Sequence, residues 1–266
     1  MPPRKPFFIQ ISDTHLFEDP AARLWDVAPD AMLDRTLDVL LAAAADPEFV
    51  LVTGDCSGDG SRQSYLRLRD KLNGLSAPVH YLPGNHDDPV LMAKLFAGRE
   101  LAPHAKLVQV FDTCGWRLIL LDSAVPGQDG GCIGSDQRIW LGKTLEAAPL
   151  TPTIVAMHHN PLPVGSAWLD AMTIADAEPL LKILDGAAQV KSVLFGHIHQ
   201  QFDVRRNGTA YMSVPSTFFQ FKPRSPEFAG DRGSQAAARI VSLSGDRADT
   251  VLVGADGSMP LTAYRQ

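Results

Sequence analysis

Residues 7–15, FFIQISDTH, decide the fold class, because an apolar run passes here directly into a polar turn. Phe7 to Ile11 has the length and composition of a short buried strand. Asp13 and His15 follow its carboxyl end, and the carboxyl ends of strands line the ligand crevice of open α/β sheets. The stretch therefore predicts a strand of an α/β sheet that delivers two polar side chains to a site.

The rest of the chain alternates between short apolar runs and segments with helical periodicity. Apolar residues at helical spacing predict helices at 29–45, 63–72, 90–96, 136–147 and 175–184. Short apolar runs predict strands at 49–52, 79–82, 153–157 and 192–195, and a hairpin at 107–111 and 116–121. Further strands are predicted near the end of the chain, at 201–206, 209–214, 236–243 and 250–254.

This order of elements predicts the arrangement of the sheets. The early alternation of strand and helix predicts parallel strands covered by helices. The β-rich end predicts a second, partly antiparallel sheet. No long linker, repeat or low-complexity run interrupts the sequence, so residues 1–266 are expected to form one domain with a β-rich part from about residue 200.

Composition excludes several classes of protein. The 266 residues include 24 Lys and Arg against 30 Asp and Glu, and this net charge of −6 argues against a partner that is a nucleic-acid polymer. The 45% hydrophobic content argues against disorder. Three scattered cysteines favour a reduced, intracellular protein, and no apolar stretch reaches the roughly 18–20 residues that span a bilayer. We therefore expect a cytoplasmic protein without a membrane partner.

Polar side chains that can bind metal ions follow five of the predicted strands. A single Asp in a turn is more often a turn former, and a single His more often a satisfied surface or core residue, so the weight lies on their joint occurrence. Because the carboxyl ends of parallel strands meet at one edge, these residues are expected to converge. They are Asp13, His15, Asp55, Asn85, His86, His158, His159, His197 and His199.

The types of these residues suit a pair of metal ions. Ions about 3.5–4 Å apart need one ligand that reaches both, and the two oxygens of a carboxylate do so. Asp55 is the predicted bridge, Asp13 and His15 can reach one ion, and the carbonyl oxygen of Asn85 can bind the other. A set of oxygen and nitrogen donors without thiolate suits Mn, Fe or Zn rather than a structural zinc site.

Two further features complete the predicted chemistry. His197 and His199 lie two residues apart and can be shared between the ions. A pair of ions clamps a phosphoryl group and makes hydroxide from water at neutral pH. His86 directly follows a ligand, and it can stand near the leaving oxygen as a general acid or as a stabiliser of charge. The expected reaction is hydrolysis of a phosphodiester.

The metal-capable blocks, taken in order, resemble the calcineurin-like metallophosphoesterase superfamily from about residue 7 to 222. The blocks are Asp13-Thr-His15, Gly54-Asp55, Gly84-Asn-His-Asp87, His158-His159 and Gly196-His-Ile-His199. The resemblance implies an α/β fold, a four-layer αββα sandwich of two mixed β-sheets flanked by helices. It also implies two ions per chain, Fe/Mn or Mn/Mn, with Zn as an alternative.

The resemblance implies a role for each residue. One ion would be held by Asp13, His15, Asp55 and His199, and the other by Asp55, Asn85, His158 and His197. His158 is preferred over His159 because the ligand of the superfamily is the first residue of that block. His86 takes the place of the histidine near the leaving group, so Asp55 and His86 are the expected catalytic residues. The residues expected to contact substrate are Asn85, His86, His159 and His199.

Within the superfamily, residues 10–17, 82–87, 195–200 and 215–223 resemble the bacterial class III 3′,5′-cyclic AMP phosphodiesterases. This resemblance implies hydrolysis of cyclic AMP to 5′-AMP by attack of metal-bound hydroxide on phosphorus. The alternative is a broad-specificity phosphodiesterase acting on other small phosphodiesters, such as 2′,3′-cyclic nucleotides or glycerophosphodiesters. Loops such as 125–134 and 164–172 are expected to determine substrate specificity. The sequence leaves open whether the protein forms a homodimer.

Other members of the superfamily fit less well. A protein phosphatase would carry Gly-Asp-x-x-Asp-Arg-Gly, whereas residues 54–60 read GDCSGDG and lack the arginine. A nuclease would need a basic stripe. A domain that only binds would have lost a ligand, and all seven positions are kept. Cys56 is expected to be a small core side chain rather than a further ligand or an oxidation-sensitive site.

Overall fold

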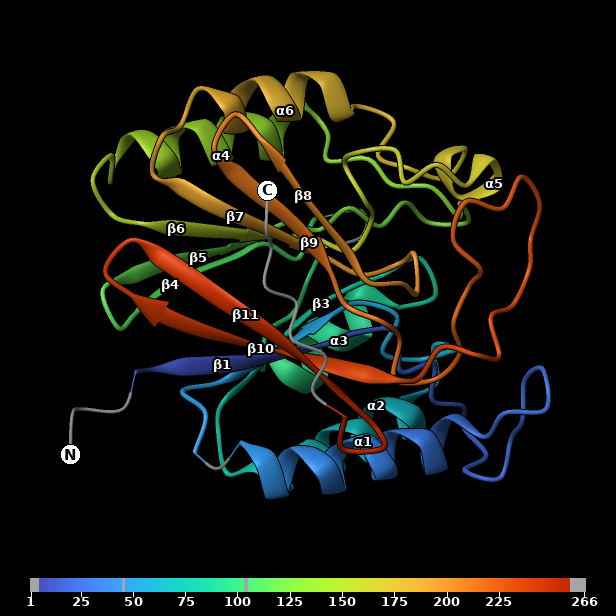
Figure 1. Ribbon diagram of the computed structural model, residues 1–266. Helices are drawn as coiled ribbons and strands as arrows, with labels where there is room; N and C mark the ends of the chain where they lie inside the picture. Colours follow the sequence, from blue (N-terminus) through green and yellow to red (C-terminus); the bar gives the residue numbers. More distant parts are fainter. Residues whose placement is uncertain (1–4, 45, 103–104, 259–266) are drawn as a thin grey trace.

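The computed structural model describes residues 5–44, 46–102 and 105–258. Two mixed sheets lie face to face, and helices cover the outer face of each (Figure 1). This is the predicted four-layer αββα sandwich. The extent of the single domain, residues 1–266, stays a prediction, because residues 1–4, 45, 103–104 and 259–266 lie outside the described part.

The first sheet joins three parallel strands to a C-terminal antiparallel hairpin. Its strands, in spatial order, are β11 (Arg247–Gly254), β10 (Ala237–Ser244), β1 (Phe7–Ile11), β2 (Val50–Thr53) and β3 (Val79–Leu82). Alternate side chains of β1 serve opposite faces, as the pleat requires. Phe7, Ile9 and Ile11 pack beneath the helices, while Phe8 packs between the sheets.

The second sheet has four parallel strands between two antiparallel edges. Its strands, in spatial order, are β4 (Gln109–Thr113), β5 (Trp116–Leu120), β6 (Thr153–Ala156), β7 (Val190–Phe195), β9 (Thr209–Ser213) and β8 (Phe202–Arg206). Trp116, Leu118 and Leu120 from β5 meet Phe8 and Leu51 of the first sheet, and they form the apolar layer between the sheets.

Helices close both outer faces (Figure 1). The first sheet is covered by α1 (Pro29–Ala43), α2 (Arg62–Leu72), the 3₁₀ turn η1 (Asn73–Leu75) and α3 (Pro89–Phe96). The second is covered by α4 (Ser135–Glu146), α5 (Ala167–Asp170) and α6 (Ala177–Asp185). Local sequence fixes the helix starts: Ser61 caps α2 by accepting from the Ser64 amide, and Asp88 caps α3 directly before Pro89.

The structure corrects the predicted β-rich end. The last four strands do not form a sheet of their own, because β8 and β9 complete the second sheet while β10 and β11 complete the first. Sheet membership follows from which strand edge each hairpin pairs with: β9 lies parallel to β7, and β10 lies antiparallel to β1. Such pairings join distant parts of the chain, and apolar runs alone do not reveal them.

The predicted elements are otherwise present, with boundaries within two residues except at the start of β11, which lies three residues earlier. The helix predicted at 29–45 ends at Ala43, and residue 45 lies outside the described residues. Two short elements, η1 and α5, were not predicted, because three or four residues are too few to show a period. No helix in the described ranges is long and apolar enough to cross a bilayer.

Candidate metal centre

Loops at the carboxyl ends of β1, β2, β3, β6 and β7 gather the predicted site residues in one place. Four groups of three side chains bring their ligand atoms within 4.8 Å of one another: Asp13, His15 and His199; Asp13, Asp55 and His158; His15, Asp55 and His86; and His158, His159 and His197. Asn85 joins them, because its Oδ1 lies 3.2 Å from Nε2 of His158. All nine predicted site residues therefore lie close together.

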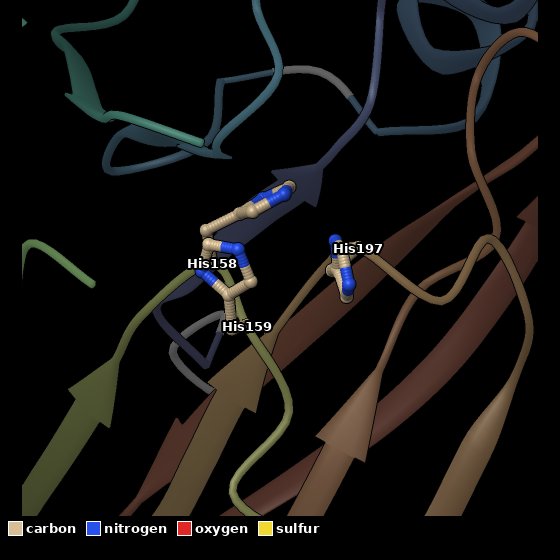
Figure 2. A group of neighbouring side chains, drawn as sticks. All are labelled: His158, His159 and His197. Atoms are coloured by element: carbon tan, nitrogen blue, oxygen red, sulfur yellow. The ribbon is translucent and has the colours of Figure 1, made fainter. Parts of the chain in front are cut away.

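Figure 2 shows three of these histidines. His158 and His159 lie in the loop after β6, and His197 lies in the loop after the neighbouring strand β7. Their rings lie close together, with centroids 5.1 Å apart for His158 and His197 and 4.5 Å apart for His159 and His197. Residues from two neighbouring strands thus meet at this edge of the sheet.

Strained backbone holds the predicted ligands in these loops. Left-handed φ values occur at Asp13 (55°), His15 (45°), Asp55 (48°), His197 (67°) and His199 (46°). A non-glycine residue in this region costs about 1–3 kcal/mol, and such strain persists where the surroundings enforce it. Five of the twelve non-glycine residues with left-handed φ values in the described chain are predicted ligands. Five such positions within one group of side chains favour a functional rather than a structural reading of these loops.

Glycines beside the ligands allow the loops to approach closely. A Cβ atom at Gly84 would lie 2.1 Å from Oδ1 of Asp55, and one at Gly196 would lie 2.0 Å from Oγ of Ser12. Either contact is too short for a side chain to be accommodated without movement of the ligand loops. This explains why glycine precedes Asn85 and His197 in the sequence.

Asp55 occupies the centre of the group. Its Oδ2 atom lies 3.3 Å from Nε2 of His158 and 3.5 Å from Nε2 of His15. Its Oδ1 atom accepts a hydrogen bond of 3.0 Å from the His86 amide. One carboxylate thus faces imidazoles from the loops after β1 and β6, while its role as a bridge stays a prediction.

Hydrogen bonds fix the tautomers of two histidines. Nδ1 of His158 donates to the carbonyl oxygen of Thr53 (2.8 Å), and Nδ1 of His199 donates to that of Phe219 (2.6 Å). A carbonyl oxygen can only accept, so each Nδ1 carries a proton, and in the neutral form of either ring the lone pair of Nε2 points inward. Bonds of this kind orient histidines that ligate metals.

The inward lone pairs face other electron-rich atoms. Nε2 of His199 lies 3.2 Å from Oδ1 of Asp13 and 3.2 Å from Nε2 of His15. Nε2 of His197 is buried and has no hydrogen-bond partner among the described residues. Acceptors brought this close repel one another unless a proton or a cation lies between them. The donor set therefore fits bound cations.

The electrostatics of Asp55, His15 and His197 favour metal-binding protonation states, whereas the pKa of His158 is raised to about 9 because Asp55 and Asp13 outweigh its burial. Burial alone would raise the pKa of Asp55, but the adjacent His158 outweighs this and holds the pKa well below its ordinary value. Burial lowers the pKa of His15 to about 3, although Asp55 opposes it. Burial, together with neighbouring His159, also holds the pKa of His197 well below its usual range. Ionised carboxylates and neutral imidazoles are the forms that bind metal ions.

His159 and His86 differ from the other histidines. Nε2 of His159 donates to the carbonyl oxygen of Asp129 (3.1 Å), and its Nδ1 lies 2.8 Å from Oγ of Ser123, so both ring nitrogens are engaged. His86 is exposed at the rim, with its ring 5.0 Å from that of His15. His86 is therefore free to meet a substrate, whereas His159 ties two loops together.

Asp87 belongs to the centre although it was not among the predicted site residues. Its carboxylate accepts hydrogen bonds from the amides of Gly84 (2.9 Å), Cys56 (3.1 Å) and Ser57 (3.0 Å), and from the hydroxyl of Tyr65 (3.1 Å). It clamps the loop after β3 onto the loop after β2. Its place in the block from Gly84 to Asp87 was the available signal.

Cys56 is a core side chain, as predicted. It is buried in the core between the first sheet and its helices. Burial, with the nearby charge of Asp87, raises the pKa of its thiol well above the ordinary value. A protonated thiol is neither a good nucleophile nor a good ligand.

A cavity of about 270 Å³ opens over the group of ligands. Asp55, Asn85, His86, His197 and His199 are among its lining residues. Aromatic side chains form much of the remaining wall, and no lysine or arginine is found among the described residues that line it. The cavity thus offers ligand atoms on its floor and apolar surface above them.

Comparison with known proteins decides the family. The model of the calcineurin-like phosphoesterase family matches residues 8–201. The chain belongs to this family. Calcineurin-like phosphoesterases use a dinuclear metal centre, and the His and Asp groups described above fit one.

Relatives in the family include named phosphodiesterases. The chain is 37% identical over 223 residues to the 3′,5′-cyclic adenosine monophosphate phosphodiesterase CpdA of Vibrio vulnificus, covering 84% of this chain and 80% of the relative. It is 35% identical over 224 residues to CpdA of Pseudomonas aeruginosa, with the same coverage. It is 34% identical over 223 residues to CpdA of Escherichia coli, again covering 84% and 80% of the two chains.

Solved structures agree on the fold. A dimetal phosphatase from Danio rerio superposes with a TM-score of 0.73 at 16% identity, covering 94% of this chain and 95% of that one. A purple acid phosphatase from yellow lupin gives a TM-score of 0.66 at 13% identity, covering 97% of this chain and 53% of that one. At these identities the likeness shows the fold of the calcineurin-like phosphoesterase family alone.

Proposed function

We propose that this chain hydrolyses 3′,5′-cyclic AMP to 5′-AMP as a dinuclear metal-dependent phosphodiesterase. The observation that carries the proposal is the position of Asp55, whose Oδ2 lies within 3.5 Å of imidazole nitrogens from two different loops. A carboxylate in that position suits a bridge between two ions. The choice of cyclic AMP is supported by the relatives named above, which are 34–37% identical over most of the chain.

The proposed ligands are those predicted from the sequence. Asp13, His15, Asp55 and His199 would hold one ion, and Asp55, Asn85, His158 and His197 the other. The donors are imidazole nitrogens and oxygens while the thiol of Cys56 stays protonated, and this set suits Mn, Fe or Zn. We propose Fe/Mn or Mn/Mn, with Zn as the alternative. When bound, the ions supply Lewis-acid polarisation of the phosphoryl oxygens and activate water at neutral pH.

The residues of the chain supply orientation and a proton. In the reaction a bond forms between a water oxygen and phosphorus, and the bond from phosphorus to O3′ breaks. His86, exposed at the rim, would donate the proton that the leaving O3′ needs. Asn85 would meet the phosphoryl group from the floor of the cavity, where His199 also lies, with its Nδ1 held by the Phe219 carbonyl. His159 would fix the loop around Asp129 through its ring nitrogens.

The lining of the cavity supports a diester rather than a monoester. At neutral pH a diester carries one negative charge and a monoester close to two. The lining includes Asp129 and, among its described members, neither lysine nor arginine. Such a wall would repel a dianion more strongly than a monoanion.

Free cysteines are consistent with the cytoplasm as the proposed location of the protein. A homodimer stays a prediction.

The test measures kcat/KM on protein that has been stripped of metal and refilled with Mn²⁺. Three substrates are compared: 3′,5′-cyclic AMP, bis-p-nitrophenyl phosphate and glycerophosphoethanolamine. We expect metal-dependent turnover with cyclic AMP as the preferred natural ester. Turnover of the activated ester without turnover of cyclic AMP would refute the substrate. Preference for glycerophosphoethanolamine would favour the broad-specificity alternative.

A further inference from the structure

Aromatic rings continue outward from two of the predicted ligands. Phe221 stacks on His199, with ring centroids 4.1 Å apart and an interplanar angle of 13°. Phe218 lies 5.8 Å from His15 and faces Trp25 at 6.0 Å and 14°. These separations are typical of aromatic pairs. The rings therefore lead from the ligand imidazoles to the mouth of the cavity.

The outer rings of this wall are exposed. Trp25 is 39% exposed and Phe228 is 50% exposed, and they are the two aromatic residues among the exposed large hydrophobic side chains of the described chain. Both line the cavity above the ligands. Their rings lie 5.2 Å apart, and Phe228 also contacts Trp168 at 5.3 Å. Exposed aromatic surface beside a polar floor is typical of a ligand site.

The turn that carries Trp25 is strained. Leu24 and Val27 exchange two backbone hydrogen bonds of 3.0 Å, and the two residues between them have left-handed φ values, 50° for Trp25 and 64° for Asp26. Asn and Gly are the usual residues in such a turn, and a bulky side chain there is an outlier. This strained turn places the indole ring of Trp25 at the mouth of the cavity.

Trp168 is a further aromatic member of the wall. It lines the same cavity from α5, and its buried Nε1 has no hydrogen-bond partner among the described residues. An indole N–H normally finds an acceptor when it is buried. Because this nitrogen is covered by its surroundings, Trp168 contributes ring surface to the wall, beside Phe221 at 4.9 Å and Phe228 at 5.3 Å.

We propose that Trp25, Trp168, Phe221 and Phe228 form a nucleobase-binding wall that stacks on the base of the substrate while its phosphate lies on the ligands below. This proposal rests on the proposed function and deepens it, because it assigns the choice of a nucleotide over a base-free diester to these side chains. The cavity reaches from His197 and His199 to Trp25 and Phe228, so one small molecule can contact floor and wall together. Flat aromatic surface, with no lysine or arginine among the described residues that line the cavity, suits an uncharged heterocycle.

The test separates the base from the phosphate by using adenosine and inorganic phosphate as probes. Both are measured as inhibitors of bis-p-nitrophenyl phosphate hydrolysis by the Mn²⁺-loaded enzyme. Binding of adenosine to metal-stripped protein is also followed by ligand-observed NMR. The variants are Trp25→Leu, Trp25→Phe and, as a control on an exposed apolar residue outside the cavity, Ile139→Ala.

Stacking of one base is worth about 1–3 kcal/mol, which corresponds to about 5- to 150-fold in affinity. We expect Trp25→Leu to weaken adenosine binding and to raise KM for cyclic AMP by a factor in this range, with inhibition by phosphate unchanged. Trp25→Phe should keep most of the affinity, and Ile139→Ala should change nothing.

Two results would contradict the proposed nucleobase-binding wall. In one, adenosine affinity in Trp25→Leu stays within about two-fold of the wild type. In the other, phosphate and adenosine weaken in parallel, which would mean that Trp25 supports the ligands through Phe218 instead of binding a base. An enzyme that binds adenosine at Trp25 but does not hydrolyse cyclic AMP would refute the proposed substrate while keeping the wall.

Discussion

Nε2 of His158 lies 3.3 Å from Oδ2 of Asp55, while Nδ1 of the same ring lies 2.8 Å from the carbonyl oxygen of Thr53. The carbonyl fixes the proton on Nδ1, so the other nitrogen of the neutral ring turns a lone pair toward the carboxylate. In the absence of a cation the ring relieves this repulsion by taking a second proton, and Asp55 with Asp13 raises the pKa of His158 to about 9 despite its burial. A metal ion competes with that proton for the same position.

Asp55→Ala tests the bridging role. The side chain faces two imidazoles, so its loss should weaken both ion sites together. Loss of about 4 kcal/mol of transition-state stabilisation would lower kcat/KM about 1,000-fold. Metal content per chain, measured by elemental analysis after dialysis, should fall from two ions toward none. A variant that retains two ions would show that another residue is the bridge.

His86→Ala tests the proton donor separately from the metal. The ring is exposed at the rim, so its loss should leave the metal content and the fold intact. General acid catalysis contributes about 10²–10⁴-fold, and kcat for cyclic AMP should fall in this range. The loss should be smaller for bis-p-nitrophenyl phosphate, because nitrophenolate leaves without a proton. Equal losses on both substrates would contradict the assigned role.

The sequence was sufficient to predict the convergence of the site. Asp13, Asp55, Asn85, His158 and His197 each follow a short apolar run, and the carboxyl ends of parallel strands meet at one edge. The structure brings them together as expected, while their roles as ligands stay a prediction. The periodic spacing of apolar side chains and the polar residues that follow strands are local signals, so they can be recognised in a single sequence.

Other features depend on non-local contacts. Whether β10 joins β1 or a separate sheet is decided by pairing over more than two hundred residues. The different states of His158 and His159 follow from partners such as Thr53 and Ser123 in distant loops. The wall of Trp25, Trp168, Phe221 and Phe228 comes from three separated segments that show no common spacing in the sequence.

Asp87→Ala tests the clamp between the ligand loops. It removes the acceptor of three amides and one hydroxyl, and an unsatisfied buried donor costs about 1–3 kcal/mol. We expect the free energy of unfolding to fall by roughly 3–5 kcal/mol in urea denaturation, since water can reach some of these groups.

The neighbouring Asp88 provides a matched control. Its carboxylate caps α3 by accepting from the amides of Val90 and Leu91, so Asp88→Ala should cost about 1 kcal/mol. Similar losses in the two variants would show that Asp87 does not hold the loops together.

His80→Phe tests a pH effect away from the metal centre. His80 lies on β3, where its ring stacks on Phe111 at 3.8 Å and 10°. Burial lowers its pKa below the ordinary value of 6.5, and a hydrogen bond with Gln109 opposes this only in part. The ring is therefore neutral in the folded protein at a pH where the unfolded chain already takes a proton.

The sign follows from this difference in bound protons. At pH 8 the ring is neutral in both states and contributes no pH dependence to stability. As the pH falls through 6.5, the unfolded chain gains a proton that the folded protein does not, so wild-type stability decreases. Phenylalanine keeps the stacking and cannot titrate. Urea denaturation of both proteins between pH 8 and 5 should therefore show a smaller loss in His80→Phe, and parallel curves would mean that His80 titrates equally in both states.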